Sequence, residues 1–280
     1  MGKMISINFF RRAGVLITGL SAAALIAACS SGGGPSGGGA SAGPSLAPRH
    51  VLLVAATRAQ QLTSGTWTLT SQVSGVVSAT ISETLVLQRK PVLRLASHVR
   101  VAAAGKSTQL KEIVTGTAVY FSTAQLTRQL GKPWVKVDLS ALKGPAGASA
   151  AQLVRSLQSY NFSDQAAETL KLAKNVRVVG TRTVNGVPTT EYSCTLNAAA
   201  GRKALPASFR KALAPELRAL GNTSIRLHVW IDRQNRMRRW TEILTVGGLT
   251  VHSTVTVMAL NQPVHITLPP ASQTATRPGA

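Results

Sequence analysis

Residues 67–73 read Trp-Thr-Leu-Thr-Ser-Gln-Val, and every second side chain of this run is suited to burial. The alternation is typical of a β-strand with one buried face. The side chains of that face are Trp67, Leu69, Ser71 and Val73. The same period of two recurs in residues 79–87 and again in 93–101. Three such runs in succession predict long, neighbouring antiparallel strands.

Further runs with a strand pattern follow along the chain. They are 108–114, 117–122, 133–139, 176–183, 187–196, 223–232, 237–246 and 249–259. Asn185-Gly186 joins two of them with a dipeptide that favours a two-residue hairpin turn. Residues 233–236 supply a second turn. The sequence therefore predicts about ten mostly sequential antiparallel strands, and a sheet of that size tends to curl.

Helical periodicity is confined to a few stretches. One is 50–62, before the first strand, and the others are 149–160, 164–174 and 205–220. Pro215 predicts a kink in the last of them. Each stretch has a single apolar stripe, which needs an apolar surface to pack on. The concave face of a curled sheet offers one, so we expect an α+β fold in which a large antiparallel sheet covers a few helices.

Composition narrows the classes of function. The chain has 280 residues, of which 44% are hydrophobic, enough for one domain with a core. Lysine and arginine number 31 against nine acids, which gives a formal charge of +22. Carboxylates are so few that enzymes with acid pairs, and proteins with acidic metal clusters, are disfavoured.

The N-terminus has the pattern of a bacterial export signal. Three basic residues precede an uncharged stretch at 13–28, and the stretch ends in Ile-Ala-Ala-Cys. This ending resembles the lipobox of bacterial lipoproteins, so Cys29 is the expected site of acylation. The apolar stretch is shorter than the roughly 20 residues that cross a bilayer, which disfavours an uncleaved span. The Arg11-Arg12 pair leaves a twin-arginine export route open, but two adjacent arginines are also ordinary charge at the start of an export signal, and we prefer that interpretation.

Acyl chains on Cys29 would anchor the protein to the cell membrane, on its extracytoplasmic face. We expect a signal peptide over 1–28 and the lipidated cysteine with a flexible Gly/Ser/Pro tether over 29–48. A single domain is expected over 49–271. The polar residues 272–280 are expected to be a disordered tail.

Cys194 is the second cysteine of the chain. It alternates with Tyr192 and Leu196 along an expected strand, which is typical of a small buried hydrophobe. Pairing with a cysteine of another chain stays open. A disulfide within the mature chain is excluded, because the anchor uses Cys29.

Four stretches give the sequence a resemblance to a known family. They begin with Gly131-Lys132-Pro133-Trp134, Val179-Gly180-Thr181, Val229-Trp230-Ile231-Asp232 and Gln262-Pro263-Val264. In this order, and together with the lipobox, they resemble the actinobacterial envelope lipoproteins of the mycobacterial lipid-carrier type. The resemblance implies a half-barrel sheet wrapped over helices, similar to the periplasmic lipoprotein-carrier fold. It also implies a hydrophobic cavity between sheet and helices, which holds acylated glycolipids or triacylglycerol-like lipids.

The residues alone leave open whether such a cavity exists. Aromatic residues are only 4% of the chain, and small side chains favour gaps. Cores of Val, Leu and Ala nevertheless commonly close to native packing density. The expected cavity walls are Trp67, Leu69, Ile81, Leu85, Leu93, Leu95 and Val99, capped by Leu153, Leu157, Leu213 and Leu217. Residues 140–150 and the region of Pro215 are candidate gates.

The positive charge predicts anionic partners. For an exported, anchored protein these are phospholipid headgroups and anionic envelope polymers, and each basic residue near such a surface contributes about 1 kcal/mol. Lipid or lipoglycan is the expected ligand. Nucleic acid is not expected, because aromatic residues are not interleaved with basic ones as in single-strand binders.

We expect neither catalysis nor a metal or cofactor. His228 and Asp232 share a strand face, but at about 3.3 Å per residue they lie roughly 13 Å apart. That exceeds hydrogen-bond reach, so they cannot form a catalytic dyad. His98 and His252 have no acid at a suitable spacing, and no nucleophile elbow, phosphate loop or metal motif is present.

Two functions of different classes follow. The first is a membrane-anchored lipoprotein that binds or transfers acylated lipid in a cavity between sheet and helices. The second is a non-catalytic interaction or sensor module of the envelope, with a filled core. Its basic surface would bind an anionic polymer or a protein partner.

Overall fold

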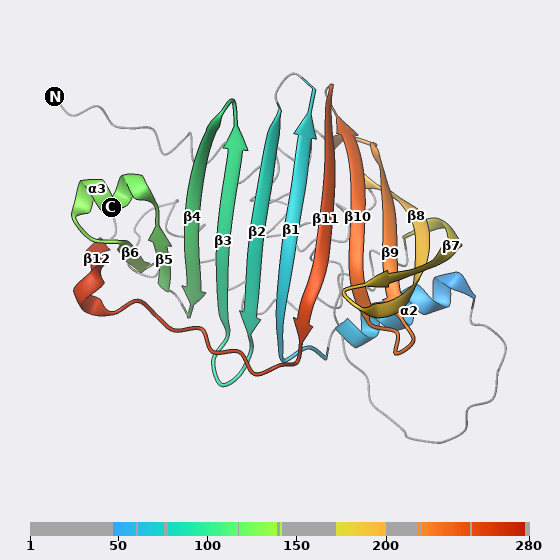
Figure 1. The fold of residues 1–280 in the computed structure, drawn as a ribbon, viewed down its shortest axis with the longest axis horizontal. Coiled ribbons are helices and arrows are strands. Elements are labelled where there is room, and N and C mark those ends of the chain that lie inside the picture. Colours follow the sequence, from blue (N-terminus) through green and yellow to red (C-terminus); the bar gives the residue numbers. More distant parts are fainter. Residues whose placement is uncertain are drawn as a thin grey trace.

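A single open sheet dominates the protein (Figure 1). The structure is a computed structural model that describes residues 47–59, 61–75, 78–116, 118–138, 141, 172–199, 218, 220–246 and 248–277. The expected signal peptide, Cys29 and most of the tether lie outside these residues. So do nearly all of the helical stretches expected at 149–160, 164–174 and 205–220, the candidate gate at 140–150 except Ala141, and the candidate gate at Pro215.

Twelve strands form the sheet, in the order β12-β6-β5-β4-β3-β2-β1-β11-β10-β9-β8-β7. Their bounds are β1 Ser64–Ser74, β2 Ala79–Gln88, β3 Arg94–Ala103, β4 Lys106–Thr115, β5 Ala118–Ser122, β6 Trp134–Asp138, β7 Lys174–Val184, β8 Val187–Asn197, β9 Ser224–Asp232, β10 Met237–Val246, β11 Leu249–Leu260 and β12 Thr274–Arg277. The expected fold class, a large antiparallel sheet with helices, is confirmed.

Two meanders make up most of this order. Strands β1 to β6 follow one another on one side, and β7 to β11 do so on the other. The first and last strands of the two meanders, β1 and β11, pair antiparallel and join them into one sheet. The expected hairpin turn between β7 and β8 is present, with positive φ angles of 48° at Asn185 and 76° at Gly186.

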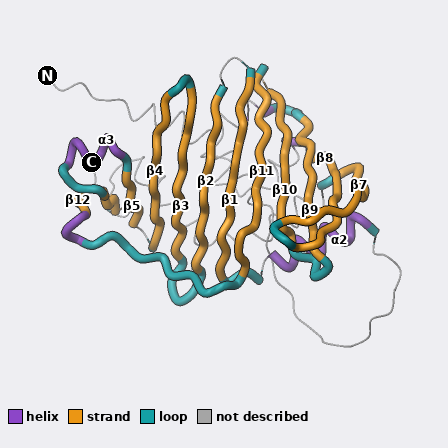
Figure 2. The backbone as a smooth tube through the Cα atoms, viewed as in Figure 1, coloured by secondary structure: helices purple, strands orange, loops and turns teal. Residues whose placement is uncertain are grey.

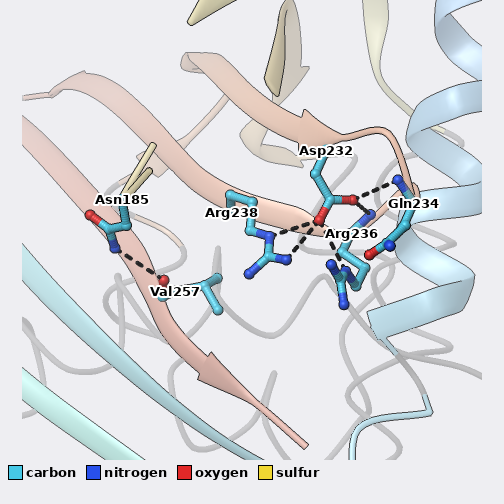
Figure 3. Close-up of polar contacts among 6 residues, drawn as sticks. All are labelled: Asn185, Asp232, Gln234, Arg236, Arg238 and Val257. Carbon is cyan, nitrogen blue, oxygen red and sulfur yellow. Dashed lines mark hydrogen bonds and ion pairs between the residues drawn. The ribbon is translucent and has the colours of Figure 1, made fainter. Parts of the chain in front are cut away.

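The sheet curls strongly at its β7 end. Asn185, at the tip of the β7–β8 hairpin, donates a hydrogen bond of 3.4 Å from Nδ2 to the carbonyl oxygen of Val257 on β11 (Figure 3). Strands β9 and β10 separate β8 from β11 in the sheet, so this contact requires the hairpin to fold back. Figure 1 shows β7 running almost across the direction of β1 to β4.

Helix α2 (Pro48–Ala59) packs on what we call the inner face of the sheet. Its buried residues, Val51, Leu52, Ala55 and Ala56, form the stripe expected from the sequence. They contact apolar side chains that alternate along β8 and β9, including Tyr192, Cys194 and Val229. Cys194 is 2% exposed, and burial raises its pKa to about 11, so it is a buried hydrophobe as expected.

The opposite, outer face is covered at the β2–β6 end by the C-terminal segment 262–270. Figure 2 shows this segment running along the ends of the long strands toward β12. Ile266 is buried against Ile113 of β4 and Tyr120 of β5. Its N–H donates to Gln88 Oε1 at 2.8 Å, and its carbonyl accepts from Arg94 Nη1 at 2.5 Å.

The expectation of a disordered tail at 272–280 is wrong as far as Arg277. Residues Ala271–Gln273 form a 3-10 turn, and Thr274–Arg277 form β12, which pairs parallel with β6. The polar composition of this segment concealed the strand, because pairing with β6 satisfies its backbone without requiring a hydrophobic pattern.

A short helix also differs from expectation. Helix α3 (Ala124–Leu130) lies between β5 and β6, where no helix was expected. Thr123 caps it by accepting a hydrogen bond from the N–H of Leu126, and Gly131 ends it in the left-handed conformation with φ 66°. Of the helix expected over 164–174, only residues 172–174 are described, and they are not helical, since β7 begins at Lys174.

Candidate functional site

An apolar cavity of about 340 Å³ lies on the inner face, where α2 ends and the chain enters β1. Its volume is within the range of about 300–1,000 Å³ that is usual for small-molecule sites. Strands β1, β2, β3, β10 and β11 form its wall. The larger apolar side chains of this wall are Trp67, Leu85, Leu87, Leu95, Trp240 and Val257.

Sheet pairing brings these residues together. Trp67 lies opposite Leu85 on β2 and opposite Val257 on β11, so three strands contribute one row. The indole of Trp67 covers Gly65, where an added Cβ would overlap the ring at its Cη2 atom. Only a glycine at position 65 lets the indole take this position along the cavity wall.

On the described part of the inner face, the region under α2 is filled and the region beyond the end of α2 is hollow. Leu69, one inward position beyond Trp67, is 4% exposed and belongs to the core under α2. Trp67 and Leu95, beyond the end of the helix, remain half-buried. The cavity therefore begins where the helical cover ends, among the residues that the structure describes.

The structure divides the expected wall residues into three groups. Trp67, Leu85 and Leu95 line the cavity. Leu69, Ile81 and Val99 are buried, and Leu93 precedes β3 and is half-buried. Leu153, Leu157, Leu213 and Leu217 lie outside the described residues, as does Cys29.

Several lining residues were missing from the sequence-based set. They include Leu62, Met237, Trp240, Val257 and Leu260. The alternating pattern of β10 and β11 indicates which side chains share a face of each strand. It does not indicate that these side chains lie beside Trp67. That proximity depends on the pairing of β1 with β11, which are almost two hundred residues apart, and short sequence patterns carry no signal for it.

Arginines supply most of the charge of the lining. They are Arg58 from the last turn of α2, Arg89 after β2 and Arg236 before β10. A carboxylate holds one of them: Asp232 Oδ2 accepts from Arg236 Nε at 3.0 Å and from Arg238 Nε at 2.8 Å (Figure 3). No acidic residue lines the cavity within the described part of the chain.

Asp232 also orders the turn between β9 and β10. Its Oδ1 accepts from the N–H groups of Gln234 and Arg236, both at 2.9 Å. Burial alone would raise the pKa of Asp232, but hydrogen bonds from the Arg236 backbone and from the Arg238 and Arg236 side chains lower it below its ordinary value. The Asp232 carboxylate therefore remains ionised and fixes Arg236 at the cavity.

Three glutamates also lie on the inner face. Ser97 donates from Oγ to Glu83 Oε1 at 2.8 Å, and Glu112 lies opposite Ser97 on β4. Burial raises the pKa of Glu112 to about 7, with the charge of Glu83 as a second cause. Burial raises the pKa of Glu242 on β10 to about 8, although Ser253 partly offsets this with a hydrogen bond. Burial raises the pKa of all three carboxyls and so shifts them toward the neutral form, in which a carboxyl can donate a hydrogen bond.

A second depression, of about 460 Å³, lies between the β7–β8 hairpin and the β9–β10 turn. Threonines and charged residues such as Arg182 and Asp232 form much of its lining. This surface does not suit hydrocarbon. The smaller but more apolar cavity beside Trp67 is therefore the candidate site.

A histidine, a carboxylate and an arginine lie together on β7, β8 and β9. His228 Nδ1 lies 2.8 Å from Glu191 Oε1, on the neighbouring strand, and Arg182 Nε lies 3.2 Å from Glu191 Oε2. From the sequence, His228 could be compared only with Asp232 on its own strand. Its contact with Glu191 depends on the pairing of β8 with β9, which the sequence does not reveal. Within the described residues, no three His, Cys, Asp or Glu side chains are placed to hold a metal ion. In the same part of the chain, no helix is long and apolar enough to span a bilayer.

Comparison with known proteins gives one sequence relative and several structural ones. No protein-family model matches the chain. An uncharacterized 31.2 kDa protein from the rplA-rplJ intergenic region of Streptomyces griseus is 27% identical over 147 residues. The match covers 51% of this chain and 48% of that protein, so this chain spans about half of the relative's length.

Among solved structures, the fold is similar to those of LprF from Mycobacterium bovis and the lipoprotein LppX of Mycobacterium tuberculosis. LprF is 12% identical, with a TM-score of 0.45 over 79% of this chain and 96% of LprF. LppX is 17% identical, with a TM-score of 0.41 over 79% of this chain and 96% of LppX. The likeness is one of fold alone. Both of these proteins are mycobacterial, and LppX is a lipoprotein.

Proposed function

We propose that this protein is an exported lipoprotein, anchored to the cell membrane through Cys29, that binds or transfers acylated lipid between its sheet and its helical cover. The observation that supports this is the apolar cavity beside Trp67. Hydrocarbon in contact with its wall would leave water, which contributes about 25 cal/mol for each Å² of apolar surface buried. Trp67, Leu85 and Leu95 are the proposed contacts among the residues expected from the sequence.

The proposed anchor and the proposed cavity support one role. A tether after Cys29 would keep the domain at the membrane surface, where acylated lipids are available. The excess of basic residues would add attraction to anionic headgroups. The alternative, an interaction module with a filled core, gives no reason for half-buried apolar residues around an unfilled volume.

Native mass spectrometry of the full chain carrying Cys29→Ser tests the proposal, since this variant has no acyl chain of its own. We expect the protein to retain lipid of defined mass after incubation with extracted envelope lipids. Replacing Leu85 and Leu95 together by tryptophan fills the cavity and should lower the retained fraction at least tenfold. A protein that stays free of lipid under all conditions would contradict the proposal.

A matched control separates cavity filling from a general effect of added tryptophan. Val178 and Val179 on β7 are 52% and 51% exposed and lie outside the cavity lining. Their double replacement by tryptophan should leave lipid retention unchanged. Equal losses in both double variants would contradict a site at Leu85 and Leu95.

A further inference from the structure

The charge at the cavity is not balanced. Of the three arginines in its lining, Arg236 is paired with Asp232. Arg58 and Arg89 make no side-chain hydrogen bond or ion pair with any described residue. Two guanidinium groups are thus available at one apolar cavity.

Arg89 also has a polar atom that lacks a partner. Its Nε is shielded from solvent and makes no hydrogen bond to the described protein. A buried donor without a partner costs roughly 1–3 kcal/mol, and more when the group is charged. A ligand oxygen that accepted from this nitrogen would remove that cost. The position of Arg89 therefore suits an anionic or strongly polar group that comes from outside the chain.

We propose that the cavity selects amphiphiles with an anionic group, a carboxylate or a phosphate, which Arg58 and Arg89 bind while the hydrocarbon contacts Trp67 and Leu85. This inference rests on the proposed function and specifies the ligand class of the same site. Guanidinium groups bind carboxylate and phosphate with paired, charge-assisted hydrogen bonds. The apolar wall adds the requirement for an attached chain.

The wall also distinguishes such an amphiphile from a free anion. Inorganic phosphate could reach the guanidinium groups but would leave the wall in contact with water. An uncharged ester with the same chain could cover the wall but would leave Arg58 and Arg89 unpaired. Only a molecule with both parts satisfies both features of the cavity.

Fluorescence quenching by brominated lipid provides the test, because Trp67 and Trp240 line the cavity. The probes are dibromostearate and its uncharged methyl ester, offered to full-length protein carrying Cys29→Ser. We expect dibromostearate to bind at least tenfold more tightly than the ester. Combined Arg58→Gln and Arg89→Gln substitutions should remove this preference and leave binding of the ester unchanged. Inorganic phosphate should not displace dibromostearate.

Arg128→Gln is the matched control for a lost positive charge, because Arg128 lies exposed on α3 and outside the cavity lining. It should keep the preference for the acid. Equal binding of acid and ester, unaffected by the arginine substitutions, would overturn the inference but leave the proposed lipid-binding function in place. If neither probe quenches fluorescence or binds, both the inference and the proposed function are wrong.

Discussion

Two neighbouring parts of the inner face differ in how they are filled. Where α2 covers the sheet, Leu52 of the helix and Val255 of β11 are 1% and 2% exposed and belong to one core. Beyond Ala59, where α2 ends, Trp67 and Leu95 border an open volume. Both parts are built from the same alternating strands. Strand alternation alone therefore does not distinguish the filled part of the described inner face from the part that borders the cavity.

The largest expected effect compares a leucine from each part. Leu52→Ala should lower the free energy of unfolding by about 3 kcal/mol, because a fully buried side chain is lost and a new cavity remains. Leu95→Ala should lower it by about 1 kcal/mol or less, since Leu95 already borders open volume. Urea denaturation of both variants measures the difference. Equal losses would mean that the cavity wall is packed as tightly as the core.

A second prediction concerns the exclusion of water from Glu242 on the inner face. The pKa of Glu242 is about 8 in the folded protein against an ordinary value of 4.5, so the native state binds its proton more tightly than the unfolded state. The free energy of unfolding should therefore fall, by about 2 kcal/mol, as pH rises from 6 to 8. The contribution of Glu242 is complete below pH 4.5 and is lost as pH rises through 8.

Glu242→Gln is the control for this pH dependence. The amide cannot ionise, so the variant should lose stability less steeply over the same range. Glu112, with a pKa of about 7, contributes in the same direction, and the double variant with Glu112→Gln should show the smallest slope. Urea denaturation at four pH values would check both. Identical slopes in wild type and Glu242→Gln would show that this carboxyl is hydrated.

The smallest expected effect concerns the indole at the border of the cavity. Gly65→Ala should destabilise the protein by about 1–2 kcal/mol, because the new methyl group overlaps the ring of Trp67. It should also change the tryptophan emission. Gly180→Ala on β7, where an added Cβ meets nothing within 4 Å, should change stability by less than about 0.5 kcal/mol. Unchanged emission in Gly65→Ala would contradict the position of the indole.

Local pattern was enough to predict most strands of this protein. The period of two in β1, β2 and β3, and the Asn185-Gly186 turn, depend on neighbouring residues only. Strand β12 and helix α3 were not predicted, for two different reasons. The strand is held by a distant partner, β6, and the helix is only seven residues long and buries none of its side chains.

The candidate site was predictable only in part. Alternation placed Trp67, Leu85 and Leu95 on the inner face, but it placed Leu69 and Ile81 there in the same way. Alternation alone does not say which of them lines the cavity and which is buried. The arginines were recognised as charge, but not as members of one site, since α2, β2 and β10 are far apart in sequence.

The amino-acid sequence by itself determined the strand alternation, the hairpin turn and the inward faces, because the side-chain period and turn dihedrals are local properties. The tertiary structure alone decided that β1 pairs with β11, that Arg58 and Arg89 meet at one cavity, and that Asp232 neutralises Arg236 but neither of the other two. These features depend on long-range pairing and on the closeness of groups in space. No local pattern specifies them.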